Sequence, residues 1–279
     1  MIDTHQHLWN PPALKYPWLE GIPAINRPFL IDDYRKAADG CGITGSVFVE
    51  CAADGDSTRR EADWILGLAG DPANRVAGVV ASVWPERQDF ARDLDRMASH
   101  PSLKGIRRVL HTEPDELSQS LLFVENVRRL GPLGLVFDLC VLERQLPLAL
   151  ALVRKCPEVP FVLDHCGVPD IAARAPEFWR EQIALLAACP NVACKVSGLL
   201  LYAAEDQRTA EGVRPWFGHV VDSFGWERLL WGGDWPVCTL AVPLARWVAV
   251  THDLLNLSSA GPGQREPFLA GNARRIYRL

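Results

Sequence analysis

The chain has 279 residues, of which 48% are hydrophobic and 23% charged, and its formal net charge is −5. This size and composition are typical of one large globular domain or two small ones. The acidic balance excludes a basic surface for nucleic acid or anionic membrane, and no run reaches the roughly 18 apolar residues of a membrane span.

Eight short apolar runs, rich in β-branched residues and bounded by glycine, proline or polar turns, recur along the chain. Most are almost continuously apolar, which indicates strands of a parallel sheet that are buried on both faces. The predicted strands are Ile2–His7, Gly45–Cys51, Ala77–Val83, Leu103–Val109, Leu135–Val141, Phe161–Gly167, Val192–Gly198 and Leu229–Trp235.

Segments with helical periodicity separate these runs, and the clear cases are Thr58–Gly70, Asp89–His100, Ser118–Leu130, Leu146–Cys156, Trp179–Cys189 and Val213–Phe224. Eightfold alternation of strand and helix indicates parallel pairing through crossover helices. No linker or change in composition divides the chain. We therefore expect a single (β/α)8 barrel over residues 1–279, with an open sheet as the alternative.

Two segments do not fit the repeat. Trp9–Leu30 carries five prolines among its aromatic residues and is expected to be an ordered loop arching over the barrel mouth. Glu266–Leu279 is expected to be a helix that closes the barrel. The eight cysteines include no CxxC pair, and the amino terminus lacks a secretory signal, so we expect free thiols and a cytoplasmic protein.

Polar side chains gather at the ends of three predicted strands. His5 and His7 end the first strand, His165 lies at the end of the sixth, and Asp234 follows two glycines at the end of the eighth. Residues two apart on a strand point to the same side, and the carboxyl ends of barrel strands form the reactive face. Each residue alone has a structural explanation, such as a satisfied core histidine or a helix cap. Together they predict one catalytic centre.

Three imidazoles and one carboxylate suit a borderline divalent cation such as Zn²⁺, which polarises a carbonyl and lowers the pKa of bound water. The same groups also have a role without metal. The imidazoles would donate hydrogen bonds to an oxyanion while Asp234 takes a proton from the attacking water. The residues alone do not choose between these modes.

Further charges lie on the middle strands. Glu50 and Lys195 are expected to form an ion pair inside the barrel, which is the common fate of inward charges. Arg107 and Arg108 are neighbours on one strand and therefore point to opposite faces. At most one of them enters the barrel, and we expect the other to pair with an outer helix.

Motifs along nearly the whole chain resemble the amidohydrolase superfamily, in particular its amidohydrolase-2 branch of sugar-lactone and dicarboxylate-lactone hydrolases. They are Ile-Asp-Thr-His-Gln-His-Leu-Trp at 2–9, Leu-Lys-Gly-Ile-Arg at 103–107, Leu-Asp-His-Cys-Gly at 163–167, Trp-Gly-Gly-Asp-Trp-Pro at 231–236 and Gly-Asn-Ala-Arg-Arg-Ile-Tyr at 271–277. The first and last strand motifs are specific in combination, whereas His-x-His alone is weak.

The resemblance implies that His5, His7 and His165 bind metal or polarise a carbonyl and that Asp234 binds metal and activates water. Many superfamily members use a histidine on strand five, where this chain offers Asp138. This difference favours one divalent metal, or none, over two. The candidate substrate-binding residues are Arg107, Lys104, Glu50, Trp18, Trp84, Asp138 and Lys195, with the tryptophans either stacking on a sugar ring or anchoring loops.

The expected reaction is hydrolysis of a small-molecule sugar-acid lactone, of the L-fucono or L-rhamnono type. Mixed charges in the site suit a neutral polyhydroxylated substrate better than a dicarboxylate lactone, which would call for several converging arginines. The alternatives are a zinc-dependent nonoxidative decarboxylase that uses nearly the same four residues and, more weakly, a dicarboxylate lactone hydrolase or a barrel that binds a sugar acid without catalysis. The sequence is compatible with a homo-oligomer but does not indicate the oligomeric state.

Overall fold

Eight short strands follow one another around a single parallel sheet in chain order, as the repeat predicts. The computed structural model describes residues 1–279. The strands are β1 (Ile2–Gln6), β2 (Gly45–Val49), β3 (Val76–Ser82), β4 (Leu103–Val109), β5 (Val136–Cys140), β6 (Phe161–Leu163), β7 (Val192–Val196) and β8 (Leu229–Trp231).

The sheet closes between β1 and the segment that follows β8. Gln6 forms a parallel bridge with Trp235, and the His7 amide donates to the Trp235 carbonyl at 2.8 Å. The Asp234 amide donates to the His5 carbonyl at 2.7 Å. The predicted single barrel is therefore confirmed, and the seam of the barrel runs through two of the predicted site motifs.

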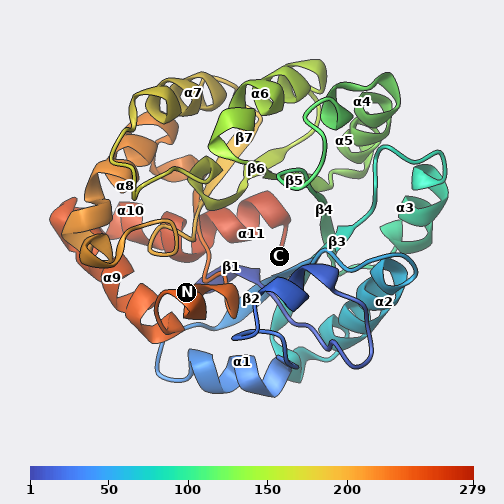
Figure 1. Cartoon of the computed structure of the whole chain (residues 1–279), viewed down its shortest axis with the longest axis horizontal. Coiled ribbons are helices and arrows are strands. Elements are labelled where there is room, and N and C mark those ends of the chain that lie inside the picture. Colours follow the sequence, from blue (N-terminus) through green and yellow to red (C-terminus); the bar gives the residue numbers. More distant parts are fainter.

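The helices lie outside the strands and form a ring around the barrel, except for α11, which lies over its centre (Figure 1). They are α1 (Ile31–Ala38), α2 (Ser57–Ala69), α3 (Phe90–Ala98), α4 (Leu121–Arg128), α5 (Leu130–Leu133), α6 (Leu146–Lys155), α7 (Glu177–Ala187), α8 (Ala210–Phe224), α9 (Leu244–Leu257), α10 (Pro262–Glu266) and α11 (Asn272–Tyr277). The six helices expected from periodicity are present within a few residues, and α1, α5, α9 and α10 are additional.

Side chains that alternate along the strands build layers inside the barrel. Val136 of β5 belongs to a small apolar cluster at the barrel floor, Asp138 lies two residues further on, and Cys140 lines the pocket above. The same alternation occurs on β7, where Ala193 lies in the floor cluster, Lys195 lies two residues further on, and Ser197 follows after the end of the strand. An apolar floor thus supports a charged middle layer below the site.

The tail closes the floor, although not as one continuous helix. A turn of π-helix at Pro267–Gly271 separates α10 from α11. Ala273 and Tyr277 of α11 belong to the floor cluster, and the Tyr277 hydroxyl is 3.0 Å from both carboxylate oxygens of Asp138. The closing role expected of this segment is confirmed, and it includes a polar contact with the charged layer.

Replacing Tyr277 by phenylalanine is expected to lower the free energy of unfolding by about 1.5–3 kcal/mol, the usual range for a hydrogen bond to a charged group. The ring keeps its packing, so the loss isolates the hydroxyl contact with the buried Asp138 carboxylate. Urea unfolding of the two proteins measures the difference. A loss below about 0.5 kcal/mol would show that the hydroxyl contributes little.

The loop 9–30 is ordered and lies at the carboxyl end of the barrel, as expected. Trp9 and Phe29 pair in an antiparallel bridge, and the Trp9 indole N–H donates to the carbonyls of Ile25 and Arg27. Trp18 donates to the Cys51 carbonyl at 2.8 Å and so ties the loop to the end of β2. These contacts fix the loop as one wall of the pocket described below.

All eight cysteines are free thiols, as the absence of CxxC pairs predicts, and seven of them are buried. Most lie in or beside strands and behave there as small apolar side chains. None of the helices has the length and hydrophobicity needed to cross a membrane.

Candidate active site

The histidines of the first strand motif face the aspartate that follows β8. His5 Nε2 lies 3.8 Å and His7 Nε2 3.5 Å from the same oxygen, Oδ1 of Asp234. The two imidazole rings are 4.8 Å apart and nearly perpendicular. The backbone hydrogen bonds at the barrel seam hold both motifs, so this convergence follows from the pairing that closes the sheet.

His165 joins this group from the end of β6. Its ring centre is 4.4 Å from that of His5, and its Nδ1 lies 2.8 Å from Ser197 Oγ. The predicted strands six and eight end earlier than expected because the backbone turns left-handed, with φ 53° at His165 and 54° at Asp234. Such a conformation costs a non-glycine residue about 1–2 kcal/mol, and here it places two polar side chains at the barrel mouth.

The two glycines before Asp234 make room for this geometry. A Cβ on Gly232 would lie 2.8 Å from the His5 Cβ, and one on Gly233 would lie 2.5 Å from Asp3 Oδ2. The Gly233 amide donates to Asp3 Oδ1 at 2.7 Å. The motif therefore needs glycine for close approach to β1.

Below the histidines lies a fully buried charge network. Lys195 Nζ is 2.7 Å from Asp138 Oδ2 and 2.9 Å from Asp164 Oδ1. It is also 3.3 Å from His5 Nδ1. The expected pairing of Lys195 with Glu50 is wrong, because Asp138 of β5 and Asp164, which directly follows β6, both contact the ammonium group, whereas Glu50 follows the more distant β2.

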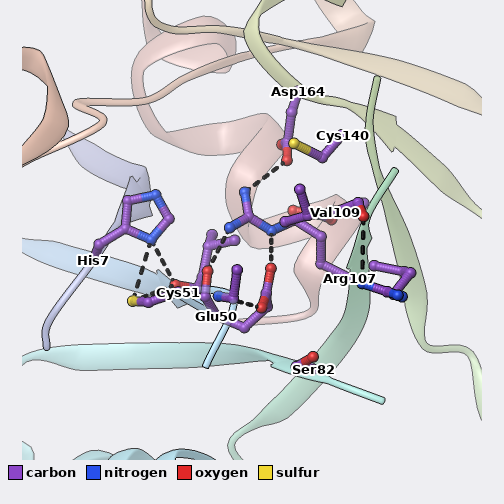
Figure 2. Close-up of polar contacts among 12 residues, drawn as sticks. His7, Glu50, Cys51, Ser82, Arg107, Val109, Cys140 and Asp164 are labelled. Atoms are coloured by element: carbon purple, nitrogen blue, oxygen red, sulfur yellow. Dashed lines mark hydrogen bonds and ion pairs between the residues drawn. The ribbon is translucent and has the colours of Figure 1, made fainter. Parts of the chain in front are cut away.

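Arg107 is the partner of Glu50, and Figure 2 shows its guanidinium between Glu50 and Asp164. Its Nε donates to Glu50 Oε1 at 2.7 Å, and Nη1 donates to Asp164 Oδ2 at 3.2 Å and lies 3.3 Å from His5 Nε2. Nη2 donates to the Glu50 carbonyl. A guanidinium has five N–H donors, so one on Nη2 has no partner within the protein.

These contacts set the charges of the centre. Burial and the neighbouring cations lower the pKa of His7 to about 3 and hold the pKa of His5 well below its usual range, so both rings are neutral. Burial would raise the pKa of Asp164, but the positive charges of Lys195 and Arg107 and a hydrogen bond from His5 outweigh it and lower that pKa. Burial raises the pKa of Asp234 to about 6, which makes it a stronger base than an ordinary aspartate.

The orientation of the imidazoles fits one divalent cation. His7 Nδ1 lies 2.7 Å from the Val49 carbonyl, which only accepts, so the proton sits there and the Nε2 lone pair faces Asp234. One ligand atom from each of His5, His7 and Asp234 lies within 4.8 Å of the others. The same holds for a second set that consists of His5, Asp164 and His165. Since Asp164 is already bound by Lys195 and Arg107, we consider the first set the better fit.

A cavity of about 520 Å³ opens above this centre. His7, His165, Asp234 and Arg107 reach its wall, whereas His5 is completely buried beneath it. Aromatic and other apolar side chains, from the loop 9–30 and from loops after later strands, form much of the remaining wall. Those aromatic residues are Trp9, Trp18, Trp84 and Tyr202.

The predicted substrate-binding residues fall into three groups. Glu50, Arg107, Trp18 and Trp84 line the cavity, whereas Asp138 and Lys195 lie below it in the buried network. The structure does not bring Lys104 to the cavity. This residue is near the amino end of β4, at the floor, where its Nζ donates to the Arg278 carbonyl at 2.8 Å. Position 104 precedes Arg107 by three residues, which is about 10 Å along the strand.

Several residues at the site were not assigned a role from the sequence. Asp164 joins Lys195, Arg107 and His5, and its place beside His165 in the strand-six motif was the available signal. His111, Cys140 and Tyr202 also line the cavity. Cys140 Sγ lies 3.4 Å from His111 Nδ1 across two neighbouring strand ends, a pairing that no local pattern indicates.

Glu61 of α2 supports the cavity wall from behind, where it is 1% exposed and accepts the Cys51 amide at 3.2 Å. Burial, with the charge of Glu50, raises its pKa from 4.5 to about 8. The folded protein keeps this proton while the unfolded chain releases it, so stability falls as pH rises from about 4.5 to 8. Relative to the wild type, Glu61→Gln should therefore gain on the order of a few kcal/mol between about pH 5 and pH 8.5.

Urea unfolding of both proteins at the two pH values measures this gain. Glu266→Gln is the control, because its carboxylate is exposed and pairs only with exposed Arg274. The control should show the same offset from the wild type at both pH values. An equally constant offset for Glu61→Gln would mean that Glu61 ionises normally in the folded protein.

Fold and site together define a barrel enzyme with a histidine–aspartate centre at the carboxyl ends of its strands. The amidohydrolase model Amidohydro_2 matches residues 2–279, and the chain belongs to this family. It is 32% identical to an L-fucono-1,5-lactonase of Burkholderia ambifaria, covering 100% of this chain and 95% of the relative. An L-fucono-1,5-lactonase of Burkholderia multivorans is 33% identical, with 100% and 96% covered.

A crystal structure of a Burkholderia multivorans amidohydrolase with bound zinc has the same architecture. It superposes with a TM-score of 0.90 at 31% identity and covers 100% of this chain and 99% of the other. The expected family membership is thus confirmed over the whole length of the barrel.

Proposed function

We propose that the protein hydrolyses a neutral sugar-acid lactone to the open-chain acid. The main observation in support is that Asp234 lies next to His7 at the floor of an aromatic-lined cavity. In addition, about a third of the chain is identical to each of two L-fucono-1,5-lactonases. The size of the cavity suits a single sugar ring. Trp18 and Trp84 in its wall can pack against the ring, and the nearby polar groups suit hydroxyls.

In the proposed reaction, Asp234 takes a proton from a water molecule as the water oxygen bonds to the lactone carbonyl carbon. Negative charge then develops on the carbonyl oxygen, where His165 and the remaining N–H of Arg107 are the available donors at the cavity wall. The bond between the carbonyl carbon and the ring oxygen breaks, and Asp234 returns its proton to that oxygen. The products are a carboxylate, its released proton and a free hydroxyl group.

His5, His7 and Asp234 would hold a divalent cation, and the relative with bound zinc supports this assignment. Charge supports it as well, because the buried network and the cavity floor hold four carboxyl groups and two cationic side chains. They are Glu50, Asp138, Asp164 and Asp234 against Arg107 and Lys195. When bound, such a cation supplies Lewis-acid polarisation of the carbonyl and lowers the pKa of a bound water.

A panel of substrates tests the reaction class. Purified protein, either zinc-loaded or treated with a chelator, is given neutral aldonolactones and, separately, aromatic acids, and proton and carbon dioxide release are recorded. We expect proton release from at least one aldonolactone above its spontaneous rate and no carbon dioxide. Carbon dioxide release without lactone opening would instead favour the decarboxylase reaction, and comparison of the two preparations shows whether metal is required.

A further inference from the structure

A second arginine reaches the cavity, and two glutamates hold it. Arg108 follows Arg107 on β4 and lines the cavity near its opening. Its Nη2 lies 2.8 Å from Glu86 Oε1 and 3.1 Å from Glu113 Oε1. The guanidinium also lies 4.9 Å from the centre of the Trp84 ring. The pairing expected with an outer helix is wrong, because Arg108 instead pairs with glutamates of two loops at the mouth.

The same arrangement occurs twice along the strand. Arg107 lies between the carboxylates of Glu50 and Asp164, and Arg108 lies between those of Glu86 and Glu113. These arginines are the only Lys or Arg side chains in the cavity wall. Each positive charge is therefore opposed by two negative ones, and the wall offers no uncompensated cation to a carboxylate ligand.

The Arg108 cluster is shielded enough for its charges to matter. The side chains of Arg108, Glu86 and Glu113 are 12%, 18% and 30% exposed, so solvent screens them less than surface pairs. Trp84 covers one face of the guanidinium and restricts its movement. The cluster thus presents a fixed, net negative charge at the cavity mouth.

The proposed reaction changes the charge of its ligand, because a neutral lactone enters and a carboxylate leaves. We propose that Glu86 and Glu113 neutralise Arg108 so that the cavity prefers neutral lactones over carboxylated ones and binds the carboxylate product weakly. This inference rests on the proposed function and specifies its substrate class. An arginine free of these glutamates would attract both kinds of carboxylate.

The test removes the two negative charges. Glu86→Gln, Glu113→Gln and the double variant are compared with the wild type for inhibition by the open-chain product. The ratio of kcat/KM for a carboxylated lactone over that for a neutral lactone of equal ring size is also measured. For the double variant we expect the inhibition constant to fall and this ratio to rise by about tenfold, the effect of roughly one uncompensated charge near the ligand.

A third substitution separates the charge effect from a change in folding. Adding Arg108→Met to the double variant should abolish the gained affinity for carboxylate if Arg108 is its source. Glu266→Gln, which removes a glutamate charge from an exposed pair far from the cavity, should change neither quantity. Unchanged inhibition and an unchanged ratio in the folded double variant would overturn the proposal.

A direct binding experiment keeps this test independent of the proposed reaction. If the wild type opens no lactone, the proposed function fails, and calorimetric titration with the open-chain sugar acid still measures carboxylate affinity in each variant. Tighter binding by the double variant, lost again with Arg108→Met, would support neutralisation of Arg108. Equal affinity in all variants would contradict it.

Discussion

Asp234→Asn is expected to lower kcat by about three orders of magnitude, within the range that general-base catalysis provides. Asparagine keeps the shape of the side chain but has no basic oxygen to take a proton from water. Asp234 is 2% exposed at the cavity floor, and burial raises its pKa to about 6, so the carboxylate is ionised and basic at neutral pH. Initial rates of proton release over a range of lactone concentrations measure the loss.

The Michaelis constant should change far less than kcat, since the substituted side chain keeps its place in the cavity wall. Asp206→Asn is the matched control, because Asp206 is exposed and pairs with exposed Arg174. Its kcat should equal that of the wild type. A near-wild-type rate for Asp234→Asn would remove Asp234 as the base.

Lys195→Met is expected to lower the free energy of unfolding by about 3–5 kcal/mol, because it leaves the buried Asp138 carboxylate without a cation and Asp164 with Arg107 alone. Asp138 and Asp164 both depend on this ammonium group, and all three side chains are 0% exposed. Methionine matches the length of the lysine stem, so packing changes little. Denaturant unfolding of the two proteins measures the loss.

The loss should also depend on pH. Without Lys195, Asp138 and Asp164 would hold protons in the folded protein more strongly than in the unfolded chain, so the variant should lose more stability at pH 8 than at pH 5. Arg174→Met, which breaks an exposed pair, should cost less than about 1 kcal/mol at either pH. A similarly small cost for Lys195→Met would mean that the network does not stabilise the barrel.

The architecture was predictable because its signals are local. Near-continuous apolar runs such as Phe161–Leu163 separated by amphipathic segments specify parallel strands and crossover helices. The ends of β6 and β8 were placed too late because left-handed turns at His165 and Asp234 depend on contacts between strands. The helix α1 was missed because it has only eight residues, so the helical spacing of its apolar residues extends over just about two turns.

The candidate site was predictable where residues share one motif and less so where partners come from several strands. His5 and His7 lie two residues apart in one strand motif, and Asp234 directly follows two glycines at the end of another. By contrast, the choice between Glu50 and Asp138 as partner of Lys195 depends on which strands are neighbours and on the height of each side chain in the barrel. Both the strand neighbours and the height of each side chain are set only when the sheet closes into a barrel.

The most direct test of the account is lactone opening in water enriched in oxygen-18, with products analysed by mass spectrometry. Asp234→Asn provides the background for spontaneous opening. The account predicts wild-type turnover well above that background, with the label in the new carboxylate and none in the hydroxyl released from the ring. Label in that hydroxyl, or equal turnover by the two proteins, would contradict attack on the carbonyl by water that Asp234 activates.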